Sequence, residues 1–231
     1  ISVSFSEELQ HDYNMKTSLL LFYVAEIYYL VNVLKETGIG TPAYLTISGT
    51  GSKVLDLIGG QPELEGIAKI VFNDIIGDDG KVELKRVGNP KEITCKGGLN
   101  MKSEDVIDDA EDLCYCFAGS TKLEGLHHAR LRDVDNVVIN QGVSFYETFI
   151  EYFFGLNSKY SFEKKFGINT QRSFPEYKRI LLEHAHEDLA AVLDARKAER
   201  NDPDAELEDS IFFFPLAGGL NRLSYYISNQ Q

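Results

Sequence analysis

A glycine turn with the sequence SGTGSK (residues 48–53) combines residue types that bind phosphate groups or ribose hydroxyls. It follows the apolar stretch 43–48, so we expect a strand, then the turn, then a helix. Glycines let the backbone approach a ligand closely, and the N–H groups at a helix start supply positive potential. Ser48, Thr50 and Ser52 add hydroxyl donors on either side. The chemistry that this pattern predicts is the binding of a phosphate or a nucleotide sugar.

The turn does not match the standard phosphate-binding motifs. A P-loop needs a glycine, four residues and then Gly-Lys-Ser/Thr, whereas here Lys53 follows Ser52 directly. The dinucleotide-binding fingerprint needs a third glycine where this chain has Val54. Taken alone, the turn is therefore interpreted as a tight structural corner, and the nucleotide hypothesis depends on the elements around it.

Composition and charge limit the classes of partner. The 231 residues suffice for one large domain or two modest ones, and 43% hydrophobic with 26% charged residues is typical of a globular protein. The net charge of −13 argues against nucleic acid and anionic membranes, which attract Lys and Arg. Three cysteines, Cys95, Cys114 and Cys116, form no disulfide framework. They favour a reducing compartment, so we expect a cytoplasmic protein.

The most apolar stretch, residues 18–34, carries Glu26 in its middle and Asn32 near its end. It is short for a bilayer, so we expect a core helix and no membrane partner. The chain opens at Ile1 without an initiator methionine, which we interpret as a piece cut from a longer protein.

Hydrophobic periodicity and turn residues predict an alternating order of elements up to about residue 100. We expect a helix from Ser6 to about Gly38, a strand at 43–48, helices from 53 and over 62–77, and a strand at 81–88. Such an order is typical of an α/β fold. Beyond residue 100 the patterns predict mostly helix, including one long helix from Phe174 to about Asn201 and a last helix after Pro215.

A long buried helix, a strand that begins at Pro42, the SGTGSK turn and a further helix together resemble the adenosine motif of the actin-like ATPase superfamily. This family includes actin, heat-shock chaperone ATPases and sugar kinases. The resemblance implies a partial actin-like (ribonuclease H-like) nucleotide-binding lobe over residues 1–100. Residues 101–231 would be a mainly helical C-terminal extension packed on that lobe.

The resemblance also implies which residues contact a nucleotide. The turn residues that would line it are Ser48, Gly49, Thr50, Gly51 and Ser52. Lys53 would cover the base. The segment NPKEITCKGGL (89–99) is similar to the next element of the family, in which Gly97 and Gly98 would allow close helix packing near the base.

By this resemblance the chain is the C-terminal part of an ATP-binding protein and supplies the adenosine side of a site between two lobes. The bound group would be ATP or ADP with Mg²⁺, and the partner would be the missing N-terminal half. The family's aspartate-glycine phosphate motifs have no copy here, because DDGK (78–81) is interpreted as a turn. We therefore expect no catalytic or metal-ligating residue in this chain, weak nucleotide binding and no measurable hydrolysis by the chain alone.

The alternative is a non-catalytic protein-interaction or scaffold module, in which the glycine turns are structural and the acidic helical tail docks a protein partner or a second copy. Exposed apolar area around Phe212–Phe214 would favour this alternative, whereas a cleft lined by 48–53 and 97–99 would favour the nucleotide site. His184 and His186 point to different sides of a helix and are not expected to share a metal ion.

Aromatic residues also recur at the spacing of one helix face. They are Phe145, Tyr146, Phe149, Tyr152 and Phe153. Core packing is the expected role, in preference to base stacking.

Overall fold

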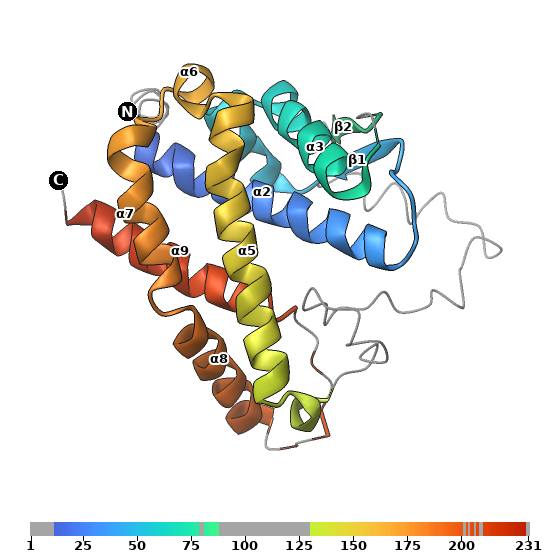
Figure 1. The fold of residues 1–231 in the computed structure, drawn as a ribbon, viewed down its shortest axis with the longest axis vertical. Coiled ribbons are helices and arrows are strands. Elements are labelled where there is room, and N and C mark those ends of the chain that lie inside the picture. Colours follow the sequence, from blue (N-terminus) through green and yellow to red (C-terminus); the bar gives the residue numbers. More distant parts are fainter. Residues whose placement is uncertain are drawn as a thin grey trace. The chain divides into compact units, whose positions relative to one another are not determined.

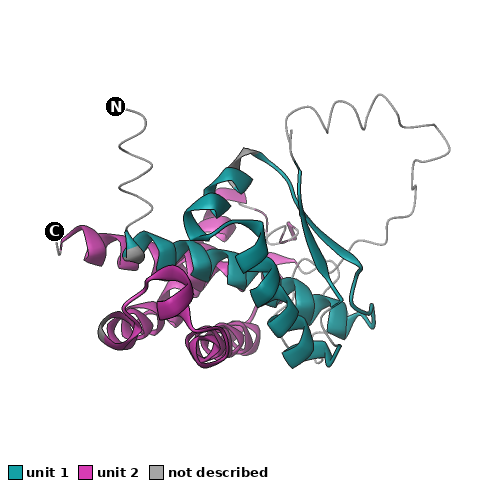
Figure 2. Cartoon of the chain, turned by 90° about the horizontal axis from the view of Figure 1, so that it is seen from above, with its two compact units in different colours: residues 1–111 teal, residues 112–231 magenta. Residues whose placement is uncertain are grey.

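The computed structural model describes residues 12–78, 81–87, 130–200, 202, 204, 205, 207 and 210–229. The chain divides into two compact units, residues 1–111 and 112–231, shown in teal and magenta in Figure 2. The sequence-based domain boundary near residue 100 falls in 88–129, outside the described residues. Each unit is described separately below.

The expected α/β fold with an actin-like lobe is wrong. Of the part that the structure describes, 75% is helical and only 5% lies in strands, which form one pair. The sequence-based prediction failed because alternation of short strand and helix patterns also fits one parallel pair within a helical unit. A doubly covered α/β lobe needs a sheet of several parallel strands, and the described residues supply two.

Helix α2 (Tyr13–Glu36) is the longest element of the first unit. Asp12 caps it, because its carboxylate accepts hydrogen bonds from the N–H groups of Asn14 (2.9 Å) and Met15 (3.1 Å). The helix ends at Thr37, whose hydroxyl donates to the carbonyl of Val33 at 2.8 Å. The predicted start at Ser6 lies outside the described residues.

By length and composition α2 could span a membrane, and it is the one such helix among the described residues. Half of its most apolar window is buried inside the fold. Leu20, Leu21, Val24 and Val31 are fully buried. This burial is typical of the core helix of a water-soluble protein, and the fold as a whole resembles that of a soluble protein.

Strands β1 (Tyr44–Ile47) and β2 (Glu83–Arg86) pair in parallel. Tyr44 lies opposite Glu83, and Ile47 lies opposite Arg86. Both strands were predicted, and the structure confirms them at a shorter length. Parallel strands need a long crossover connection, and here it consists of two helices.

The crossover begins with a 3₁₀-helix, η1 (Thr50–Ile58), where the sequence predicted an ordinary helix. With three residues per turn, side chains three apart lie above one another. Ser52, Leu55 and Ile58 have this spacing, and all three are buried. The arrangement places one narrow face of η1 in the core, against α2 and α3.

Helix α3 (Gln61–Ile76) completes the crossover and confirms the helix expected at 62–77. It begins at Gly60 with Pro62 in its first turn, and it ends at Gly77 in the left-handed region (φ 82°). The guanidinium of Arg86 on β2 forms a two-pronged ion pair with Asp56 of η1, at 2.6 and 3.2 Å. This ion pair joins the crossover to strand β2.

The second unit is a helical bundle (Figure 1). Its elements are η5 (Leu131–Asp133), α5 (Asn136–Tyr160), α6 (Phe162–Phe166), α7 (Thr170–Leu182), α8 (Ala185–Arg200) and α9 (Phe213–Ser228). Helix α5 packs against α7 and α8, and α9 packs against the same two helices. The long helix expected from Phe174 is interrupted at Glu183 and His184, so His184 lies in a turn and His186 lies in α8.

The aromatic face of α5 forms the core of this bundle, as the spacing predicted. Phe145, Tyr146, Phe149 and Phe153 are buried. The ring of Phe212 packs 5.1 Å from Phe145 and 5.5 Å from Phe149, measured between centroids. Phe212 is therefore a core residue and not part of an exposed docking patch.

Two consecutive glycines let α9 approach its neighbours closely. A Cβ at Gly219 would lie 2.9 Å from the hydroxyl of Tyr146, and a Cβ at Gly218 would overlap the carboxylate of Asp188. That carboxylate cannot easily move, because Nη1 of Arg222 binds both of its oxygens at 2.7 and 2.6 Å. Buried Tyr146 also donates a hydrogen bond to the carbonyl of Leu181 at 3.0 Å.

The close packing of α9 gives the first testable prediction. We expect Gly218→Ala to lower the free energy of unfolding by about 1–3 kcal/mol, because the added methyl group displaces Asp188 from Arg222. The matched control is Gly155→Ala in α5, where a Cβ meets nothing within 4 Å. The control should gain about 0.4–1 kcal/mol from reduced backbone freedom in the unfolded chain. Urea unfolding measures the free energy of unfolding of both variants. A higher value for Gly218→Ala as well as for Gly155→Ala would contradict the close packing of α9.

Candidate functional site

An apolar groove of about 550 Å³ opens in the first unit between α2 and β1. It is lined on the α2 side by Phe22, Tyr23, Glu26, Ile27, Tyr29 and Leu30. On the other side it is lined by Leu45, Thr46, Ile47 and Ser48 of β1 and its exit, Leu64 of α3 and Leu84 of β2. All these residues belong to one unit, so the groove is a property of that unit alone.

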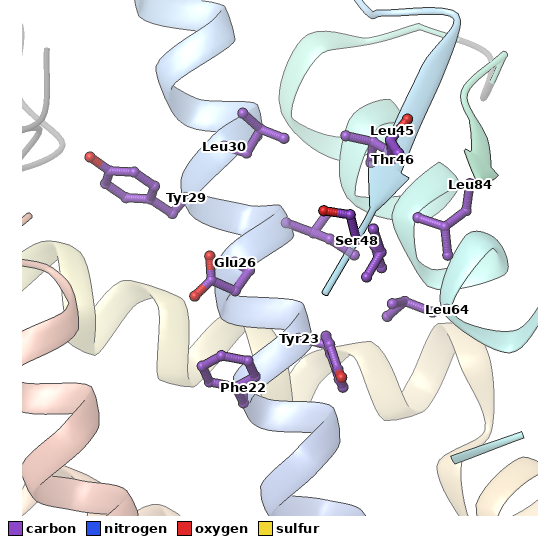
Figure 3. A pocket seen from close by; sticks show the side chains of 12 residues that line it. Phe22, Tyr23, Glu26, Tyr29, Leu30, Leu45, Thr46, Ser48, Leu64 and Leu84 are labelled. Atoms are coloured by element: carbon purple, nitrogen blue, oxygen red, sulfur yellow. The ribbon is translucent and has the colours of Figure 1, made fainter. Parts of the chain in front are cut away.

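The residues of α2 form two parallel stripes, because side chains four and seven positions apart share one side of a helix. Tyr23, Ile27 and Leu30 make the stripe on the side of the strand, and Figure 3 shows Tyr23 and Leu30 extending from α2 towards β1. The second stripe holds Phe22 and Glu26 on another side of the helix. The first stripe forms the wall of the groove and the second forms its rim.

Glu26 is the one charged side chain in the lining of the groove. Its side chain reaches solvent, yet the protein around it removes part of its hydration, and this burial raises its pKa above the ordinary value. Among the described residues no cation pairs with its carboxylate. The groove therefore presents one carboxylate that no described cation neutralises.

The outer edge of β2 is closed by side chains of α3. The carboxylate of Glu65 accepts a hydrogen bond from the N–H of Leu84 at 3.0 Å, and the side-chain amide of Gln61 donates to the carbonyl of Leu84. Lys69 binds the second oxygen of Glu65 at 2.7 Å. The hydrogen bonds from Lys69 and from Leu84 lower the pKa of Glu65, so the cap stays charged at neutral pH.

The outer edge of β1 has no such cap. The N–H groups of Glu83 and Val87 donate to the carbonyls of Ala43 and Ile47, each at 3.0 Å, which orients the odd-numbered residues of β1 towards β2. Because backbone groups alternate in direction along a strand, those of Thr46 and its even-numbered neighbours point to the outer edge. No described residue pairs with them. This edge lies beside the groove, where Thr46 and Ser48 belong to the lining.

The predicted glycine turn is used to start η1. Gly49 takes a left-handed backbone conformation (φ 94°), which a glycine adopts without strain. The hydroxyl and the N–H of Ser52 both bind the carbonyl of Gly49, at 2.8 and 3.1 Å. The Ser52 side chain is 3% exposed, so its hydroxyl serves the turn.

The other predicted nucleotide residues lie in different places. Ser48 lines the groove, Thr50 and Gly51 begin η1, and Lys53 is exposed. Gly97 and Gly98 lie outside the described residues, so the cleft expected between the two glycine segments stays a prediction. Of the predicted set, the groove includes only Ser48.

The sequence analysis missed Glu26 as a site residue, together with the capping role of Gln61 and Glu65. A signal for the groove did exist in α2, whose apolar residues cover most of its surface. The pattern predicts a core helix, whereas Phe22 is 42% exposed. Among the described residues no three His, Cys, Asp or Glu side chains are grouped as for a metal ion.

Comparison with models of protein families, with curated proteins and with solved structures finds no match for this chain. The groove and the strand edge beside it are therefore the features that indicate a function.

The environment of Glu26 gives a pH-dependent prediction. Because the folded-state pKa is raised, ionisation is disfavoured in the folded chain, and this contribution to stability falls as pH rises through the interval between the unfolded and the folded pKa. We expect Glu26→Gln to raise Tm at neutral pH and to leave it nearly unchanged at about pH 3, below the ordinary glutamate pKa of about 4.3.

Thermal unfolding followed by circular dichroism at both pH values measures the effect of Glu26→Gln. The control is Glu147→Gln on the exposed side of α5, which removes one carboxylate outside the groove and should change the neutral-pH Tm less than Glu26→Gln does. A neutral-pH Tm for Glu26→Gln at or below that of the unchanged chain would contradict the raised pKa.

Proposed function

We propose that this chain is a protein-interaction module that binds a partner protein through the groove between α2 and β1. The observation that carries the proposal is the combination of an apolar groove with a strand edge along its side that no described residue pairs. An apolar groove binds the side chains of a polypeptide, and the backbone groups of an open strand edge bind its backbone. We further propose that it acts in the cytoplasm, since three cysteines in a chain of this length favour a reducing compartment.

The chemistry of the lining supports binding in preference to catalysis. The polar residues in the lining are Tyr23, Tyr29, Thr46, Ser48 and Glu26. General acid–base catalysis uses groups of matched pKa held close to one another, and this lining offers one carboxylate. The other residues that line the groove are apolar, as in the centre of a protein–protein contact.

A peptide-display selection on the immobilised chain tests this function. We expect enriched peptides to bind with Kd in the micromolar range and Phe22→Ser to weaken them about tenfold, because Phe22 forms the rim and its partly exposed ring is available for contact. The matched control is Tyr225→Ser in α9, a 74% exposed aromatic residue of the other unit, which should not change the affinity. Selected peptides that bind both variants equally, or a selection without enrichment, would contradict the proposal.

A second candidate is adenosine-nucleotide binding by residues 48–53, with the missing N-terminal half completing the site for ATP or ADP and Mg²⁺. The observation that favours it is the parallel order β1, turn, η1, α3, β2, because ligands of parallel sheets bind beyond the carboxyl ends of strands, where Gly49 lies. The second candidate does not require the actin-like fold.

An amide NMR titration with Mg-ATP and Mg-ADP, up to about millimolar concentration, tests the second candidate. Binding should shift the amide signals of Gly49, Ser52 and Lys53. Gly49→Ala should remove the shifts, because a side chain is strained at φ 94°. Unchanged amide signals in the folded chain would contradict nucleotide binding by this unit.

A further inference from the structure

We propose that the partner binds as an extended segment that adds a third strand to the outer edge of β1. Its apolar side chains would enter the groove at alternate positions, and a lysine or arginine would face Glu26. This inference rests on the proposed interaction function and specifies the chemistry of the partner.

The first argument comes from backbone hydrogen bonds. The outward N–H and C=O groups of Thr46 and of its neighbours Tyr44 and Ser48 have no partner among the described residues, although they lie beside an apolar groove. A partner that covered the groove without pairing them would remove their water and leave them unsatisfied, which is unfavourable. An extended backbone supplies matching donors and acceptors at the spacing of the strand.

The second argument comes from the contrast between the two edges of the sheet. Gln61 and Glu65 already occupy the outward groups of Leu84 on β2. A strand added on that side would have to displace both side chains and the ion pair with Lys69. Within the described part of the chain, the sheet can therefore be extended at β1 and not at Leu84.

The third argument comes from side-chain alternation. Leu45 and Ile47 face inwards on β1, while Tyr44 and Thr46 are exposed on the opposite face. A strand added in register continues the same two faces, so every second side chain enters the groove against Tyr23 and Leu30. The partner therefore needs apolar residues at alternate positions.

Charge decides between a foreign segment and a second copy of this chain. Glu26 lacks a cation among the described residues, and the chain carries a net charge of −13, so a basic residue in the partner is complementary. In a second copy, β1 has the sequence YLTI and supplies no cation. Strand β2 has Lys85 and Arg86, but its edge at Leu84 is closed. Of the described strands of a second copy, neither supplies a cation at an open edge, and we assign the partner to a different protein chain.

A designed peptide tests the inference directly. The probe is acetyl-TVTVTKTVT-amide, whose valines and lysine share one face of an extended strand. With the ¹⁵N-labelled chain we expect hydrogen exchange at the amides of Thr46 and Ser48 to slow about tenfold or more on binding. The amide of Leu84 is the internal control, because Glu65 binds it in the free chain.

Two matched peptides isolate the two recognition elements. Replacing the lysine by glutamate should weaken binding about tenfold, and Glu26→Lys in the chain should reverse that preference. Methylation of the peptide amides on its pairing side removes strand hydrogen bonds and should abolish binding of the same side chains.

The possible outcomes separate this inference from the proposed function. Shifts at the methyl groups of Leu30 and Leu64 without slowed exchange at Thr46, or equal binding of the methylated peptide, would overturn strand addition and leave a groove-binding module. Thr46 and Ser48 amides that are already protected in the free chain would also overturn it. If the lysine peptide causes no shift at millimolar concentration, strand addition is wrong, and the display selection decides the interaction function separately.

Discussion

Parallel strands cannot be joined by a tight turn, and this constraint organises the first unit. The chain leaves β1 at Ile47, must cross back to the end of the sheet where β1 begins and re-enters at Glu83, so it needs a crossover that packs on the strands. Helices η1 and α3 provide it, and both pack on α2. Two strands alone form a marginal sheet. Three contacts stabilise the pair. Helix α3 packs on β2, and Asp56 binds Arg86. The side chains of Gln61 and Glu65 bind the outward backbone groups of Leu84, as a further strand would.

The outer edge of β1 has no neighbour among the described residues. Helix α3 lies against β2 and supplies polar side chains to its edge, but no described element does so for β1. The groove lies between α2 and β1, with Leu30 on one side and Leu45 on the other (Figure 3). The second unit shows the contrasting case, since Tyr146 and Phe212 fill the space between helices and Asp188 pairs with Arg222. In the described part of that unit, the ion pair of Asp188 and Arg222 joins α8 and α9, which already pack together.

Periodicity in the sequence predicted the elements that depend on local patterns. The strands at β1 and β2, helix α3 and the buried face of α5 follow from alternation, turn residues and helical spacing. The fold class was wrong because local patterns do not say how many strands share a sheet. The break between α7 and α8 at Glu183 was missed because residues on both sides favour helix. The site was missed because an apolar stripe such as Tyr23, Ile27 and Leu30 has the same pattern in a core as in a groove.

The glycine turn shows why a motif predicts less than its residues suggest. Gly49 has a positive φ (94°), which a glycine adopts without strain, but Ser52 uses its hydroxyl to bind the carbonyl of Gly49. Whether a hydroxyl serves the turn or a ligand depends on the φ and ψ angles of its neighbours. Ser52 lies on the buried face of η1 with Leu55 and Ile58. Tertiary packing therefore determines the role of that side chain.

The capping of Leu84 by Gln61 and Glu65 also has a consequence for the order of folding. Contacts between β1 and β2 join distant parts of the chain, and closing such a loop is entropically costly and slow. Helix α3 is local and can form first, with both capping side chains on one face. A preformed α3 would present two groups that bind the backbone of Leu84 before β1 arrives. In the folded chain these two side chains fix the position of Leu84 along α3, so the placement of β2 on the crossover depends on contacts close in sequence.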